Sequence, residues 1–372
     1  MRKCSVFAIS LLILLFISGC SHADEQTMPK PTSDTAALSV SDLRDILAAL
    51  DLSEATLTYH GKVDNSCDAS SAIREDNYIE NLQNFTWEEY LPQDGWDGSY
   101  ELRCVCTAPG VTLTAYRGNS EATRLLRVAT DNGEGMFTLP HITDEESGNA
   151  VQMNWMIFDT FMQWYDEAHT ASLYSGVGRP LTAEELDWFA DYTATEQPYY
   201  DETQDSNHVH STEISCFFTS HYDDVAALNF EKFMWYFPGD GIADPVTDVE
   251  FGALKNVDVW PFKELESLES MPVPIHKYSR STVDAALTKY ADITTADLDT
   301  SSVAYLAEYD AFYTYTSDYG PGWFIPCYGE KSGSTVTLWE APSGESDNSD
   351  MLVLKNTGDN WHILSHQPAT IS

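Results

Sequence analysis

Apolar residues recur along this chain with two periods, and these periods predict helices and strands in turn. Before residue 145, a spacing of three or four residues predicts helices over 41–50 and 70–82. Alternation of apolar and polar residues predicts strands over 55–63, 100–106, 111–116, 125–130 and 136–139. Asp131-Asn132-Gly133 is a typical hairpin turn between the last two strands. This region is therefore expected to pack helices on an antiparallel meander.

The longer second half repeats the order of helices followed by strands. Residues 152–169 carry an apolar helical stripe, and Thr182 with Glu185 forms a capping box that opens another helix. Shorter helices are predicted over 230–237 and 282–290. Strands are predicted over 209–219, 305–315, 324–328, 336–339, 351–355 and 361–366. The expected fold class is α+β, with an N-terminal domain over 38–145 and a C-terminal domain over 146–372.

The two halves also share a weak sequence similarity. Residues 111–141 align with residues 336–366 without a gap, with seven identities in 31 positions, and the two predicted turns coincide. One explanation is duplication of a terminal meander. The other is that any two antiparallel hairpins share Val, Thr and Gly. Both explanations predict that each domain ends in a twisted antiparallel sheet.

The N-terminus has the pattern of a secretory signal. Arg2 and Lys3 precede an apolar run over residues 5–16. A run of about a dozen residues is too short for a membrane span, which needs about 20. A basic start, a short apolar run and small residues after it are typical of a signal peptide.

The small residues end in Ile17-Ser18-Gly19-Cys20, which resembles the lipobox of bacterial lipoproteins. The resemblance implies that Cys20 receives a diacylglycerol thioether, becomes the first mature residue and holds the protein on the membrane. The alternative is an ordinary signal peptide with an incidental cysteine. We expect residues 1–19 to be the signal peptide. Residues 20–37 are polar and contain two prolines, which predicts a flexible tether.

Composition narrows the possible partners. The chain has 372 residues, with 59 Asp and Glu against 19 Lys and Arg, and a formal net charge of −40. Such a charge disfavours nucleic acid and anionic lipid surfaces as partners. It is typical of a solubilising extracellular surface, and it would also suit a surface that binds cations. The 10 Trp, 20 Tyr and 16 Phe leave a glycan or a protein as a possible ligand.

Five cysteines follow Cys20, and an odd number cannot pair completely within the chain: Cys67, Cys104, Cys106, Cys216 and Cys327. Cys104 and Cys106 lie two apart in a predicted strand, so they face one side and do not bridge each other. A disulfide from Cys67 to either of them and a set of buried free thiols both stay open. No Cys-x-x-Cys pair is present, so a zinc ribbon is not supported.

Three segments of the C-terminal half, residues 230–238, 283–293 and 308–322, resemble those of uncharacterised lipoproteins from gut Clostridia and related Gram-positive bacteria. The resemblance covers most of residues 200–372 and, more loosely, the N-terminal domain, and it implies a place on the outer face of the cytoplasmic membrane. It carries no known catalytic or binding residue. The order of elements in this half is also compatible with a cystatin-like or NTF2-like curved sheet.

The strongest candidate for metal binding is a group of three histidines. His208 and His210 are two apart on a predicted strand and share a face, and His221 follows eleven residues later as a natural third ligand. The competing explanation is that the first two are exposed at the end of a polar loop. Acidic residues around 240–250 and 347–350 do not have the spacing of a calcium loop. The sequence therefore assigns no metal ligand but makes the three histidines a group to test.

No sequence motif assigns a catalytic or cofactor-binding residue. The chain has no Gly-x-Ser-x-Gly elbow, His-Glu-x-x-His pair, phosphate-binding loop or dinucleotide fingerprint. Cys216 with His221 could form a nucleophile and its base, but an apolar strand around Cys216 favours an inert buried thiol. An aromatic run over 309–323 predicts either core or a stacking surface for sugar rings or a protein partner.

Together these patterns lead to a first hypothesis: a non-enzymatic, lipid-anchored binding protein of the cell envelope, with Cys20 as its one assigned site. The alternative hypothesis is an envelope-associated hydrolase that acts on glycan or peptide. A pocket that gathers the three histidines, or a close pair of carboxylates with a perturbed pKa, would favour the hydrolase. Shallow clefts lined by aromatic side chains would favour binding alone.

Overall fold

A computed structural model describes residues 26–27, 36–61, 64–72, 75–90, 99–118, 124–143, 150–201, 206–238, 245–316, 320–342, 349–358 and 360–369. Cys20, the predicted signal peptide and most of the predicted tether lie outside these residues. The chain divides into two compact units, unit 1 with residues 1–66 and 78–162 and unit 2 with residues 67–77 and 163–372. Helices and antiparallel sheets occur together, which confirms the α+β class. In the described part of the chain, no helix has the length and apolarity that a membrane crossing requires.

A seven-stranded antiparallel sheet dominates unit 1, with the strand order β3-β2-β6-β7-β8-β9-β4. Its strands are β2 (Thr56–His60), β3 (Asp64–Asp68), β4 (Glu88–Glu89), β6 (Leu102–Ala108), β7 (Val111–Arg117), β8 (Leu126–Thr130) and β9 (Gly133–Thr138). Short pairs add β1 (Gln26–Thr27) with β5 (Ser99–Tyr100) and β10 (His141–Thr143) with β11 (Ala150–Gln152). The four consecutive strands from β6 to β9 are the predicted meander.

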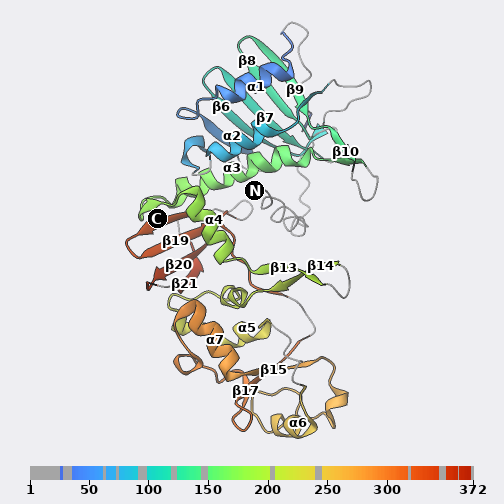
Figure 1. Ribbon diagram of the computed structural model, residues 1–372, viewed down its shortest axis with the longest axis vertical. Helices are drawn as coiled ribbons and strands as arrows, with labels where there is room; N and C mark the ends of the chain where they lie inside the picture. The colour runs from blue at the N-terminus through green and yellow to red at the C-terminus, as the bar shows by residue number, and fades with distance from the viewer. Residues whose placement is uncertain are drawn as a thin grey trace. The chain divides into compact units, whose positions relative to one another are not determined.

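Helices cover this sheet. Helix α1 (Val40–Ala48) begins after a capping box formed by Ser39 and Asp42, and it buries Leu43 and Leu47. Figure 1 shows it across the front of strands β6 to β9. Helices α2 (Glu75–Asn84) and α3 (Trp155–Tyr174) follow the predicted segments with shifted ends.

All five described cysteines are free thiols, which answers the question of a disulfide from Cys67. Cys104 and Cys106 are both buried on one face of β6, as their spacing predicts. Burial raises the pKa of the Cys67 and Cys106 thiols to about 12, with nearby Asp68 adding to the rise at Cys67. Thiols with such pKa values are protonated at neutral pH and react slowly.

The core of unit 2 is built on a five-stranded antiparallel sheet in the order β12-β18-β19-β20-β21. Its strands are β12 (Arg179–Pro180), β18 (Pro326–Ser332), β19 (Thr335–Glu340), β20 (Asp350–Asn356) and β21 (Trp361–Pro368). One face of this sheet buries Leu338, Leu352 and Leu354. Helix α7 (Arg280–Ala291) contributes Val283 and Leu287 to the same core.

The remaining elements of unit 2 are short. Helix α4 (Ala183–Tyr192) has the predicted capping box, because Thr182 accepts from the Glu185 amide while the Glu185 carboxylate accepts from the Thr182 amide. Two further α-helices are α5 (Phe230–Trp235) and α6 (Asp248–Leu254), and β13 (Glu196–Asp201) forms a hairpin with β14 (Ser206–Ser211). The 3₁₀ helices are η2 (Ala69–Ser71), η4 (Glu213–Phe218), η5 (Val225–Ala227), η6 (Leu268–Ser270) and η7 (Thr295–Asp297).

The expected strand over 209–219 is wrong beyond Ser211, because its apolar half forms η4 and buries Ile214 to Phe218 in the core.

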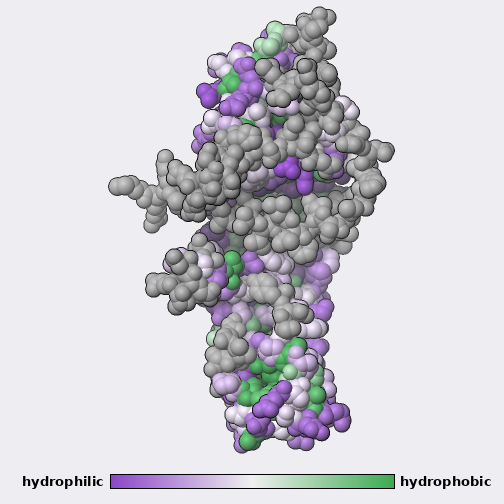
Figure 2. All heavy atoms as spheres, turned by 90° about the vertical axis from the view of Figure 1, so that its right-hand side faces the viewer, coloured by the Kyte–Doolittle hydropathy of each residue, from purple (hydrophilic) through white to green (hydrophobic). Residues whose placement is uncertain are grey.

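A second core of unit 2 lies at α6. It packs this helix against a three-stranded sheet in the order β15-β17-β16. The strands are β15 (Ile275–Ser279), β16 (Ala304–Leu306) and β17 (Ala311–Tyr315), so the single strand expected over 305–315 is in fact two. Figure 2 shows hydrophobic surface at this end of unit 2, where Leu268, Met271 and Ile275 line a cavity of about 320 Å³.

The aligned segments 111–141 and 336–366 both form meanders of three consecutive strands, β7–β9 and β19–β21. Their second turns differ, since Thr130 pairs directly with Gly133 while a longer loop containing Gly358 at φ 106° joins β20 to β21. The common strand order is thus a feature of the structure, and duplication stays a prediction.

Candidate functional site

Two polar side chains lie at one end of the core-facing side of the five-stranded sheet. Asp350 opens β20, and His366 lies near the end of β21. His366 pairs with Leu352, a buried core residue two positions after Asp350. Since residues two apart on a strand share a face, Asp350 and His366 lie on the same side of the sheet.

A third side chain reaches this place from a distant part of the chain. His221 follows η4, and its neighbour Tyr222 forms an isolated bridge with β21. The Tyr222 amide donates to the His366 carbonyl at 2.6 Å, and the His366 amide donates to the Tyr222 carbonyl at 3.0 Å. The Tyr222 hydroxyl also donates to the Phe217 carbonyl at 3.1 Å, so the segment is held at both ends.

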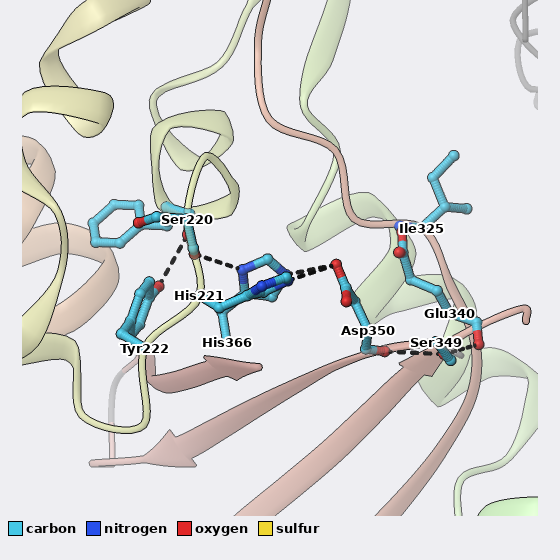
Figure 3. Close-up of polar contacts among 9 residues, drawn as sticks. Ser220, His221, Tyr222, Ile325, Glu340, Ser349, Asp350 and His366 are labelled. Carbon is cyan, nitrogen blue, oxygen red and sulfur yellow. Dashed lines mark hydrogen bonds and ion pairs between the residues drawn. The ribbon is translucent and has the colours of Figure 1, made fainter. Parts of the chain in front are cut away.

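These three side chains converge on one point (Figure 3). The Asp350 Oδ2 atom lies 3.1 Å from His221 Nε2 and 3.6 Å from His366 Nε2. The two imidazole ring centroids are 5.0 Å apart, and one ligand atom from each residue lies within 4.8 Å of the others. Among the described residues, this is the group of three or more His, Cys, Asp or Glu side chains that could hold a metal ion.

The hydrogen bonding of His366 leaves one nitrogen available. Its Nδ1 donates to the Ser220 carbonyl at 3.0 Å, because a carbonyl oxygen only accepts. Its Nε2 is buried, makes no hydrogen bond and faces the Asp350 carboxylate. Burial lowers the pKa of His366, and the Ser220 carbonyl and Asp350 offset this only in part. A neutral imidazole with Nδ1 held by a carbonyl and Nε2 free is the usual state of a metal-ligating histidine.

Two of the three separations between the ligand atoms are close to those of metal coordination. Ligand atoms about 2.0–2.1 Å from a tetrahedral zinc ion lie about 3.3–3.4 Å from one another. The separations of 3.1 and 3.6 Å from the Asp350 oxygen lie on either side of this value. Two imidazoles and one carboxylate favour zinc or a neighbouring divalent transition metal over calcium and magnesium, which prefer oxygen ligands.

A second carboxyl group adjoins Asp350. Glu340 ends β19 opposite the start of β20, where Trp339 pairs with Met351. Its Oε1 accepts from the Ile325 amide at 2.7 Å, and Ser349 donates to its main-chain carbonyl at 2.5 Å. Burial raises the pKa of Glu340 to about 7; the Ile325 hydrogen bond opposes this rise and the charge of Asp350 adds to it. The negative charge of Asp350 therefore acts on Glu340, and the pKa of Glu340 is perturbed.

Only one of the three histidines singled out from the sequence belongs to this site. His221 lies in the site, whereas His208 and His210 lie on β14 with ring centroids 5.6 and 5.3 Å from that of Tyr199. Among the described residues, the group that could hold a metal contains His221 but neither His208 nor His210, so the three histidines singled out for testing do not form one site. The residues missed were Asp350 as a partner of His221, and His366. The available signal was a histidine at a core-facing position of the last predicted strand, where a polar ring needs a partner.

The other candidates have structural roles. Cys216 is buried and its thiol donates to the Tyr236 carbonyl, so it forms no pair with His221. In the aromatic run, Phe312 and Tyr313 belong to the core. Glu250, one of the acidic residues around 240–250, closes the capping box of α6.

Comparison of the chain with protein-family models, with curated proteins and with solved structures finds no match.

Proposed function

We propose that this protein is a lipid-anchored extracytoplasmic lipoprotein whose second unit binds a divalent transition metal, zinc by preference, through His221, Asp350 and His366. The observation that carries the proposal is the buried Nε2 of His366, which has no hydrogen-bond partner and is aimed at the Asp350 carboxylate. A buried imidazole nitrogen without a partner costs free energy, and a metal ion would recover it.

Electrostatics support a cation at this place. Asp350 places a carboxylate at the site, and the chain as a whole carries a formal net charge of −40. The site itself offers two imidazoles but, among its described residues, no Lys or Arg in an ion pair with Asp350. A divalent ion would neutralise this local negative charge.

We expect the purified full-length protein to bind one zinc ion per chain. Replacing His366 with alanine should weaken zinc binding by more than about 100-fold, because even the loss of a residue that only orients a ligand costs about 10–100-fold. Isothermal titration calorimetry and elemental analysis after dialysis measure both quantities. The matched control is His208→Ala, which removes a partly exposed histidine outside the site. Equal zinc affinity of the wild type and the His366 variant would contradict the proposal.

The proposed anchor has a separate test. Cells that express the protein and are fed a labelled fatty acid should incorporate the label, and Cys20→Ser should abolish incorporation because it removes the sulfur that forms the thioether. Wild-type protein should fractionate with membranes. Labelling of the Cys20 variant to the wild-type level would contradict lipid attachment at this residue.

A further inference from the structure

In the described part of the chain, the proposed metal site has three ligand residues. No fourth described His, Cys, Asp or Glu joins His221, Asp350 and His366. Structural zinc sites have four protein ligands, whereas catalytic sites have three and a water molecule. The side chains of His221 and Asp350 are 48% and 31% exposed, so solvent reaches the site from their side. Three protein ligands and a side exposed to solvent are typical of a catalytic metal site.

A catalytic metal centre needs a proton acceptor, and the carboxyl group of Glu340 lies beside this site. The Glu340 side chain rises from the same side of the sheet as Asp350, and Figure 3 shows their carboxyl groups next to each other. One oxygen, Oε1, is fixed by the Ile325 amide, which orients the group. Among the described residues, Oε2 has no hydrogen-bond partner and is left for a water molecule.

Glu340 is placed to exchange a proton with water. Its side chain is only partly buried, so solvent reaches it. The Ile325 amide orients one carboxyl oxygen, and a carboxyl group held in this way is a suitable general base.

We propose, building on the proposed metal site, that Glu340 is the proton acceptor for a metal-bound water and that unit 2 is a metal-dependent hydrolase of esters or amides. A metal held by His221, Asp350 and His366 would supply a water of lowered pKa, and the Glu340 carboxylate would accept a proton from this water. The water oxygen would then form a new C–O bond to the carbonyl carbon of the substrate. The C–O or C–N bond to the leaving group then breaks, and Glu340 returns the proton to the leaving oxygen or nitrogen. One water is consumed, and the products are a carboxylic acid and an alcohol or amine.

The surroundings indicate the substrate class. The net charge of −40 repels polyanions, so neutral or cationic carbonyl compounds fit best. Ile325, whose amide holds Glu340, is 56% exposed and offers an apolar contact beside the carboxyl group. A small neutral ester is therefore a suitable probe.

The test uses the full-length protein in detergent, loaded with one equivalent of zinc, and 4-nitrophenyl acetate as substrate. We expect hydrolysis above that of the same concentration of free zinc. Glu340→Gln should lower kcat about 100-fold or more, since general-base catalysis contributes about 10²–10⁴-fold, and should leave zinc affinity within about threefold. His366→Ala should lose zinc and activity together. His208→Ala is the control that should lose neither.

The stability of the Glu340 variant separates catalysis from folding. Glutamine has the same shape but no charge, so the thermal midpoint of Glu340→Gln should equal or exceed that of the wild type. Glu340→Asp keeps the carboxylate and should recover part of the activity. One bound zinc ion with no hydrolysis, or with equal hydrolysis by Glu340→Gln, would overturn the inference and leave the metal proposal standing. Absence of zinc binding would overturn both.

Discussion

Replacing Glu250 with alanine should lower the free energy of unfolding of unit 2 by about 3–5 kcal/mol, because it removes the buried carboxylate that pairs with the largely buried Lys277 ammonium group. Lys277 Nζ lies 2.8 Å from Glu250 Oε1, and the two side chains are 14% and 2% exposed. The Tyr313 hydroxyl donates to the same oxygen at 2.9 Å. The other oxygen accepts from the amide and hydroxyl of Thr247.

This loss can be measured by unfolding the protein with a chemical denaturant and using hydrogen exchange of the unit 2 amides as the readout. The matched control is Glu184→Ala, an exposed acid in the first turn of α4, which should change stability by less than about 0.5 kcal/mol. Replacing Glu250 and Lys277 together with leucine and methionine should recover much of the loss, since both members of the buried ion pair are then replaced by apolar side chains. Equal stability of the Glu250 and Glu184 variants would contradict the burial of this pair.

The ion pair between Glu250 and Lys277 makes the stability of unit 2 depend on pH. Burial alone would raise the pKa of Glu250, but the hydrogen bonds from Lys277 and Thr247 outweigh it and lower the pKa to about 2, from 4.5 for an unperturbed glutamate. A lowered pKa means that the stabilisation is complete above pH 4.5 and is lost as the pH falls from 4.5 toward 2. The contribution is about 3 kcal/mol. Glu250→Ala should therefore flatten the loss of stability of unit 2 over this range.

Replacing Gly322 with alanine should both destabilise unit 2 and weaken the metal site. A Cβ atom at this position would lie 2.5 Å from the Ser215 carbonyl oxygen, 2.5 Å from the Phe218 carbonyl carbon and 2.7 Å from the Thr219 amide nitrogen. All three are backbone atoms at η4, so no side-chain rotation relieves the clash. We expect a loss of about 3 kcal/mol, at the upper end of typical overpacking costs.

The effect on the site follows from the chain order. The displaced backbone leads directly to Ser220, whose carbonyl holds His366, and to His221. Zinc affinity should fall about tenfold or more, as for other changes that misalign a ligand. Gly252→Ala is the control, because a Cβ there meets no atom within 4 Å and alanine favours the helix α6. It should stabilise by about 0.5–1 kcal/mol and leave zinc binding unchanged. Unchanged stability and zinc affinity in the Gly322 variant would refute this account.

Local sequence patterns predicted most of the strands and the capped helices, because those elements depend on nearby residues. The Thr182 and Glu185 box is one case, since both of its hydrogen bonds span three residues. The apolar run over 214–218 was wrongly predicted as a strand because a short run of this kind fits a buried strand and a buried 3₁₀ turn equally. Only the packing around it decides between the two.

The site was harder to predict than the fold. His221 could be singled out as a possible ligand, but its partners lie 129 and 145 residues further on. Their approach depends on the bridge between Tyr222 and His366, which leaves no local pattern in the sequence. Asp350 could not be chosen among 59 acids without knowing that it shares a sheet face with His366. The site was therefore identified from the positions of residues across the sheet, because their spacing along the chain does not bring them together.

The state of the cysteines bears on how the protein reaches its folded form. None of the five described cysteines forms a cross-link, so disulfides contribute nothing to the stability of the described fold. The redox potential of the surroundings then has no equilibrium between thiol and disulfide to shift. A chain that crosses a membrane unfolded could complete both units without a thiol oxidase or a disulfide isomerase on the far side. Refolding should accordingly reach full yield in the presence of a reducing agent and without an added oxidant.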